Sequence, residues 1–238
     1  MRGFADILRF DVIVQARNGF YWASGFVVLA VSALLAAMPS AVLNNPGLWV
    51  PALVMFNLQI TTFFFVAGLM LLERDEGTLI ALGASPLSAR TYLLARCTTL
   101  TTLAAVETLV IAWFGFGFSA SWALFAATAA MGITYTGFGV AVAARYESVN
   151  SLLLPASVIV TVLLLPLLGH FELAPRLLSV WHPLEPALLL LRAAYHPISR
   201  FELTFGIVGS IAWASVAFSL AQHAVEQMMR DTRASGGR

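Results

Sequence analysis

The chain has 238 residues, of which 60% are hydrophobic and only 11% are charged, with a formal net charge of +1. A soluble domain of this length needs a larger charged surface, so the composition favours a lipid bilayer as the solvent and gives no case for a nucleic-acid partner. All 13 basic residues are arginine, which excludes a phosphate-binding P-loop because that loop needs a lysine.

Six long apolar runs predict an all-α integral membrane protein with six transmembrane helices in a single domain, residues 1–238. About 20 residues are needed to cross the ~30 Å hydrocarbon core of a bilayer, and each run is of that length. The predicted spans are residues 20–38, 50–72, 97–118, 122–144, 151–169 and 203–221.

The arginines predict the orientation. Ten lie before the first span, in 73–96, in 145–150 or in the tail 222–238, whereas three lie in 170–202 and none in the other two connections. Since positive residues concentrate in cytoplasmic loops, both termini are predicted to be cytoplasmic in a multi-pass protein of the cell membrane.

Residues 1–19 predict an interfacial helix. Polar residues such as Asp6 and Arg9 fall largely on one side of the helix, but Asp11 and Gln15 interrupt its apolar face. The segment is either a plain anchor at the membrane surface or an element with a mechanical role.

The connection 73–96 predicts a helix-turn-helix at the membrane surface. Gly77 permits a sharp change of chain direction, and Ser85-Pro86 is a good helix start because serine caps free N–H groups. Such an element suits docking to a cytosolic partner, the alternative being an ordinary solvated loop. The predicted contact residues are Glu73, Arg74, Asp75, Glu76, Gly77, Thr78, Ser85 and Pro86.

Glu107 is the one ionisable residue deep within a predicted span. An intramembrane carboxylate is costly unless it is protonated, paired or hydrated. It therefore either lines a translocation path or bonds to a neighbouring helix, and both alternatives stay open. The candidate path residues are Glu107, Asn57, Gln59, Thr101 and Tyr135. On span 122–144, Gly139 and Ala143 form a small-residue pair suited to close helix packing.

The exterior connection 170–202 is rich in leucine but is broken by Pro175, Pro183 and Pro186, so it cannot be a straight span. His170 and His182 lie in this region, but histidines so widely spaced predict no metal site.

Two motifs resemble those of ABC-2 type permeases. Glu73 to Pro86 is similar to the family's run of charged residues, Gly-Thr, aliphatics and Ser-Pro before a helix. Trp181 to Arg192 is similar to its Asn-Pro-Leu element, with histidine in place of asparagine and an added proline. The matching residues of this exterior motif are His182, Pro183, Leu184 and Arg192. Residues 17–23 also resemble the start of span 1 in actinobacterial fluoroquinolone-export permeases.

The resemblance implies a transmembrane subunit that pairs with a second permease chain, identical or related, and sits on ATP-binding cassette subunits. ATP and Mg would lie on those partners, with no cofactor on this chain. Residues 73–96 would contain the coupling helix, and 173–195 would form an exterior re-entrant hairpin.

The predicted function is thus a non-enzymatic exporter subunit that moves a hydrophobic or amphiphilic substrate, such as a drug, outward through a dimer interface. A secondary transporter using Glu107 is the alternative, although a single intramembrane carboxylate and no visible repeat argue against it. An intramembrane enzyme is disfavoured by the absence of HExxH and GxSxG motifs.

Overall fold

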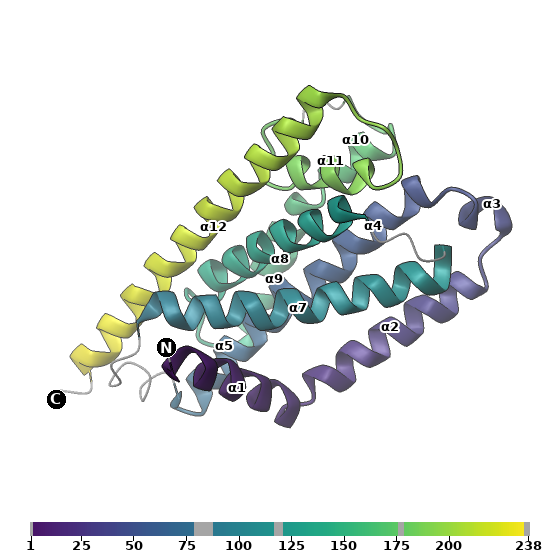
Figure 1. Ribbon diagram of the computed structural model, residues 1–238. Helices are drawn as coiled ribbons and strands as arrows, with labels where there is room; N and C mark the ends of the chain where they lie inside the picture. The colour runs from purple at the N-terminus through teal and green to yellow at the C-terminus, as the bar shows by residue number, and fades with distance from the viewer. Residues whose placement is uncertain (1, 79–87, 117–120, 176–178, 236–238) are drawn as a thin grey trace.

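The computed structural model describes residues 2–78, 88–116, 121–175 and 179–235, and these ranges form a bundle of helices without a strand (Figure 1). The helices are α1 (Arg2–Arg17), α2 (Phe20–Ala36), α3 (Ser40–Leu43), α4 (Pro46–Leu58), the π-helix η1 (Gln59–Phe64), α5 (Phe65–Asp75), α7 (Ala89–Phe116), α8 (Trp122–Ala143), α9 (Val149–Leu163), α10 (Pro166–His170), α11 (Glu185–Ala193) and α12 (Arg200–Ser235).

Five helical stretches of the described residues are long and apolar enough to cross a membrane. They are Pro46–Asp75, Ala89–Phe114, Trp122–Ala143, Val149–His170 and Arg200–Arg230. A sixth is counted if α1 and α2, which meet at 66°, are taken as one broken span. The predicted fold class, an all-α membrane protein with about six spans, is confirmed at this level.

The bend between α1 and α2 is made at Gly19, whose φ of +78° is left-handed. Glycine adopts this conformation without steric cost, so it commonly ends a helix. The Asn18 side-chain amide also donates to the Val14 carbonyl oxygen at 2.9 Å. α1 therefore lies at a steep angle to α2, as an interfacial helix requires.

Helix α8 lies at the centre of the bundle and contacts α4, η1, α5, α7, α11 and α12. Small residues allow this close approach. A Cβ atom added to Gly139 would lie 2.7 Å from Val66 Cγ1, and one added to Gly137 would lie 2.7 Å from the backbone of Ala217. The close helix packing predicted for Gly139 is confirmed.

Two predicted boundaries need correction. α7 begins at Ala89, so residues 89–96, predicted as the second helix of the connection, are continuous with the helix of the predicted span that follows. α12 continues to Ser235, so most of the predicted tail 222–238 is helical. Its buried stripe passes through Ala221, Val225 and Met229, one turn apart. Hydropathy located the lipid-crossing part of each helix, whereas packing against neighbours decides where the helix ends.

Both chain termini lie at one end of the bundle, and α10 and α11 lie at the other (Figure 1). α11 is short but deeply buried, because it packs against α8, α12 and α4. Pro186 fits a notch on α12, where a Cβ atom on Gly209 would lie 2.7 Å from Pro186 Cγ. The added proline of the exterior motif thus has a packing role.

Candidate functional site

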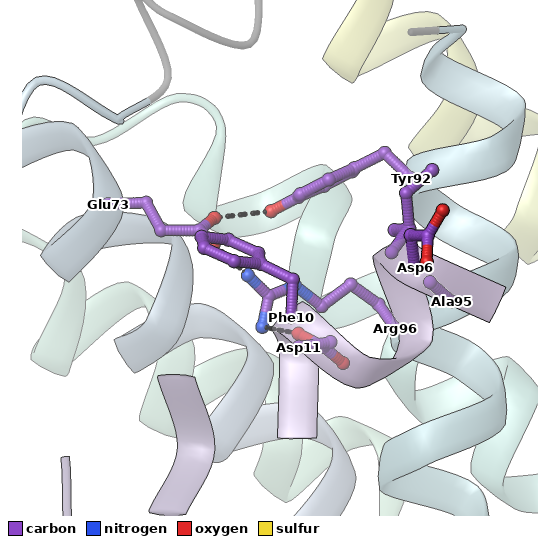
Figure 2. A pocket seen from close by; sticks show the side chains of 8 residues that line it. Asp6, Phe10, Asp11, Glu73, Tyr92, Ala95 and Arg96 are labelled. Atoms are coloured by element: carbon purple, nitrogen blue, oxygen red, sulfur yellow. Dashed lines mark hydrogen bonds and ion pairs between the residues drawn. The ribbon is translucent and has the colours of Figure 1, made fainter. Parts of the chain in front are cut away.

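The side chain of Arg96, on α7, lies where three segments of the chain meet (Figure 2). Its guanidinium forms ion pairs with Asp11 of α1 and with Glu73 of α5, and all three side chains are at most 4% exposed. Ions are buried to this extent only when they are paired, because the desolvation cost is large. We call these three residues the Arg96 cluster. It joins the N-terminal helix to two predicted spans.

A second set of polar side chains holds the carboxylates of the Arg96 cluster in place. The Tyr92 hydroxyl donates to Glu73 Oε2 at 2.7 Å, and Gln15 Nε2 donates to Asp11 Oδ2 at 2.9 Å. The Thr99 hydroxyl also donates to Asp11 Oδ2. Arg96 Cζ lies 5.2 Å from the centroid of the Tyr92 ring, within range of a cation–π interaction.

The Arg96 cluster explains the pattern of α1. Asp11 and Gln15, which interrupt the apolar face expected from sequence, are buried against α7, whereas Phe10, Val12 and Ile13 are exposed. The polar pair Asp11 and Gln15 therefore faces the protein, and the exposed face mixes apolar side chains with Asp6, Arg9 and Arg17. Sequence reasoning did not select Asp11, Gln15, Tyr92 or Arg96; the signal was a polar i, i+4 pair within an otherwise apolar face.

Two of the predicted contact residues serve the fold of the chain itself. Glu73 is buried in the Arg96 cluster, so its side chain is not accessible to a partner protein. Arg74 donates to the carbonyl oxygens of Tyr146 and, at 3.3 Å, of Ala144. These carbonyls follow the C-terminus of α8, where a cation is favoured by the helix dipole.

The residues after Arg74 are more accessible. Asp75 and Glu76 are exposed, and Arg17 Nη2 donates to both Glu76 carboxylate oxygens at 3.3 Å. Gly77 ends the helix with a left-handed φ of +69°, as its predicted turn requires, and Thr78 is half-buried. Ser85 and Pro86 lie outside the described residues.

Glu107 is buried and bonds to side chains on three other helices. Its carboxylate accepts from Asn57 Nδ2 at 2.9 Å, from the Thr61 hydroxyl at 2.5 Å and from the Ser24 hydroxyl. These partners lie on α4, η1 and α2 respectively. The geometry is that of the structural alternative, in which Glu107 joins helices through hydrogen bonds.

Of the other candidate path residues, only Asn57 is brought to Glu107. Gln59 Oε1, Thr101 Oγ1 and the Tyr135 hydroxyl are buried without a hydrogen-bond partner in the described part of the chain. Thr101 packs instead against Gly132, where an added Cβ would lie 2.7 Å from its Oγ1 atom. Sequence reasoning did not select Ser24, which lacks any local distinguishing pattern.

At the end of the bundle opposite the termini, His182 bonds to its own turn and to the end of α9. Its Nδ1 accepts from the Leu184 backbone N–H at 3.2 Å, and its Nε2 lies 3.0 Å from the Val162 carbonyl oxygen. Pro166 has no N–H to donate to that carbonyl, which accepts from the Leu165 N–H at 3.1 Å instead and has the imidazole as a second partner. Burial lowers the pKa of His182 below its ordinary value, more than the bond to Val162 raises it.

The neutral imidazole explains how histidine replaces asparagine in the exterior motif, since Nδ1 accepts the turn hydrogen bond that an asparagine oxygen would accept. Pro183 follows in the turn, Leu184 is buried, and Arg192 lies half-buried in the last turn of α11. Within the described ranges, no three His, Cys, Asp or Glu side chains converge in a way that could hold a metal ion.

The apolar helices of the described residues define a multi-pass membrane protein. The chain belongs to the Fluoroquinolones export permease protein family, which it matches over residues 2–231. It is similar to the fluoroquinolones export permease proteins of Mycobacterium tuberculosis strains CDC 1551 / Oshkosh and ATCC 25618 / H37Rv. Each is 28% identical over 221 residues, which cover 90% of this chain and 91% of the relative.

The Arg96 cluster predicts unequal effects of two conservative substitutions. Glu73→Gln leaves a buried guanidinium with one carboxylate fewer, so we expect the melting temperature in detergent to fall by about 6–12 °C, or roughly 3 kcal/mol. Glu76→Gln removes an exposed contact and should cost at most about 1 kcal/mol. Equal shifts for the two variants would contradict the assignment.

For Glu107, the geometry predicts that glutamine is tolerated and leucine is not. The amide of Glu107→Gln can accept from Asn57 and donate to Ser24, so the melting temperature should stay within a few degrees of the wild-type value. Glu107→Leu leaves buried donors without an acceptor, and we expect a loss of about 1–3 kcal/mol. Glu147→Leu, at an exposed carboxylate, is the control. A large loss with Gln would show that the charge itself is needed.

The His182 turn predicts a pH dependence of stability. Its folded pKa lies below the unfolded value of about 6.5, so the folded state should be fully stabilised above that pH and lose stability as pH falls. His182→Asn keeps the turn acceptor but does not titrate. The fall in melting temperature between pH 7.5 and 5.5 should therefore shrink in this variant. His223→Asn, at an exposed histidine, should show the same decrease in melting temperature as the wild type. The same decrease in His182→Asn would refute the prediction.

Proposed function

We propose that the chain is the membrane-spanning permease subunit of an exporter that moves amphiphilic drugs out of the cell. The supporting observation is the match to the Fluoroquinolones export permease protein family over residues 2–231, together with fluoroquinolones export permease proteins that align with 90% of the chain. Fluoroquinolones are therefore the first substrates to test.

The proposal includes an ABC-2 type arrangement, in which ATP is hydrolysed on a separate ATP-binding cassette subunit. This chain has no lysine and hence no P-loop. The proposed contact is the exposed end of α5 at Asp75 and Glu76, continuing into the turn at Gly77. The excess of arginines on this side supports a cytoplasmic position for it and for both termini.

A second permease chain, identical or related, completes the proposed exporter, with the substrate moving outward through the dimer interface. The outward faces of α2, α9 and α12 carry large exposed apolar side chains, such as Phe26, Leu154 and Ile211. Lipid covers some of this surface in the proposed dimer, and the second chain covers the rest.

A secondary transporter that couples protons through Glu107 is the competing function. Both carboxylate oxygens of Glu107 are engaged by Ser24, Asn57 and Thr61. A coupling carboxylate has to exchange its proton with water during each cycle. The bonds around Glu107 favour a structural role over this one.

The source of energy decides between the two functions. Inside-out vesicles that contain the chain and its ATPase subunit should accumulate norfloxacin when ATP is supplied, and a non-hydrolysable ATP analogue should stop uptake. A protonophore should have little effect. Combining Glu76→Arg with Gly77→Val should abolish uptake without loss of membrane insertion, whereas Glu147→Arg should not. Uptake that follows the proton gradient and ignores ATP would overturn the proposal.

A further inference from the structure

A pocket of about 310 Å³ lies between α1 and α7, directly beside the Arg96 cluster (Figure 2). Ile7, Phe10, Tyr92 and Ala95 supply apolar surface to its walls, the Arg96 cluster contributes the buried ionic part, and Asp6 completes the lining. A volume of this order holds a small drug-like molecule.

The lining has an excess of negative charge. Of the residues that line the pocket, Asp6, Asp11 and Glu73 are acidic, and Arg96 is basic. Asp11 and Glu73 are both paired with Arg96, and Tyr92, Gln15 and Thr99 donate further hydrogen bonds to them. Asp6 adds a third carboxylate to the lining, so a cation placed in the pocket would be stabilised.

Asp6 differs from the two buried carboxylates. Its side chain is exposed, and no hydrogen bond or ion pair to it is found among the described residues. It lies one helical turn before Phe10 on the same α1 helix. It is therefore placed to pair with a ligand cation without first giving up an internal partner.

We propose that this pocket is the first binding site for an amphiphilic organic cation, with its ammonium group near Asp6 and its apolar body against Phe10 and Tyr92. The inference rests on the proposed export function and names the substrate class and the place where it first binds. Fluoroquinolones that carry a piperazine ring have a basic amine and an aromatic body, and so fit this description.

The chemistry of the lining favours an organic cation over a metal ion. The oxygens of Asp11 and Glu73 already accept from Arg96 and from neighbouring side chains. A hard metal ion needs about six oxygen ligands that are free to coordinate. An ammonium group on an apolar body needs only the negative field and the apolar wall.

The position of the pocket suits a ligand that arrives through lipid. Phe10 lines the pocket and is 49% exposed, with the exposed side chain of Ile13 one helical turn away. An amphiphile in the adjoining leaflet would meet these apolar side chains first. Its charged group could stay at the membrane surface, where amphipathic molecules keep their polar ends.

The test measures binding to the full chain in nanodiscs of neutral phosphatidylcholine, without ATP or a partner. Ethidium is the aromatic cation and anilinonaphthalene sulfonate is the aromatic anion of similar size, with empty nanodiscs as the blank. We expect Asp6→Asn to weaken ethidium binding about two- to fivefold, as loss of one exposed ion pair implies. Glu147→Gln, a neutralised carboxylate outside the pocket, should leave the ethidium Kd unchanged.

A second variant tests the pocket independently of charge. Ile7→Trp places a larger apolar side chain in the lining and should weaken ethidium binding while keeping the apolar character of α1. Equal ethidium Kd values for the wild type, Asp6→Asn and Ile7→Trp would overturn the inference, as would tighter binding of the sulfonate than of ethidium.

The outcome is separable from that of the proposed function, because binding is measured without ATP. Ethidium binding that depends on Asp6, combined with no ATP-driven export, would contradict the proposed export function while supporting the proposed binding pocket. Conversely, ATP-driven norfloxacin export that is unaffected by Asp6→Asn and Ile7→Trp would contradict the proposed binding pocket while supporting the proposed export function.

Discussion

The burial of Arg96 between two carboxylates is the constraint on which one end of the bundle depends. A guanidinium at 2% exposure is stable only where acceptors surround it, and those acceptors come from residues 85 and 23 positions earlier in the chain. α1 must therefore lie against α7, and α5 must end beside both. The left-handed turn at Gly19 makes this possible, because it lets α1 turn across the bundle before α2 begins.

The same constraint connects the proposed ATPase contact to the spans. Within one helical turn at the end of α5, Glu73 pairs with Arg96, Arg74 binds carbonyls beyond α8, and Glu76 meets Arg17. A displacement of the chain after Asp75 would thus act on α7, α8 and α1 together. Buried ion pairs and helix-end contacts transmit such a displacement better than exposed pairs, because they cannot be replaced by water.

The fold class could be predicted from sequence because lipid imposes a simple requirement, a run of about 20 apolar residues for each helix that crosses. The site could not. Asp11, Glu73 and Arg96 are distant in sequence and share no local periodicity, so their pairing appears only in three dimensions. α1 shows why the local pattern misleads. Polar residues on a helix are expected to face solvent, but Asp11 faces the buried Arg96 guanidinium and Gln15 donates to Asp11.

The surroundings of the buried carboxylates differ along α7. The Arg96 cluster lies at the terminal end and holds its carboxylates by ion pairs, whereas Glu107, far along α7, is held by one amide and two hydroxyls. The π-helix η1 starts two residues after Asn57 and carries Thr61, and both side chains reach the same Glu107 oxygen. A hydroxyl can donate to a carboxylate or accept from a carboxyl group, so this arrangement tolerates either form of Glu107. Both oxygens of Glu107 already accept hydrogen bonds, so neither is free to bind a passing cation. In the proposed exporter, selection of substrate by charge therefore belongs to the terminal end, where Asp6 lines the pocket beside the Arg96 cluster.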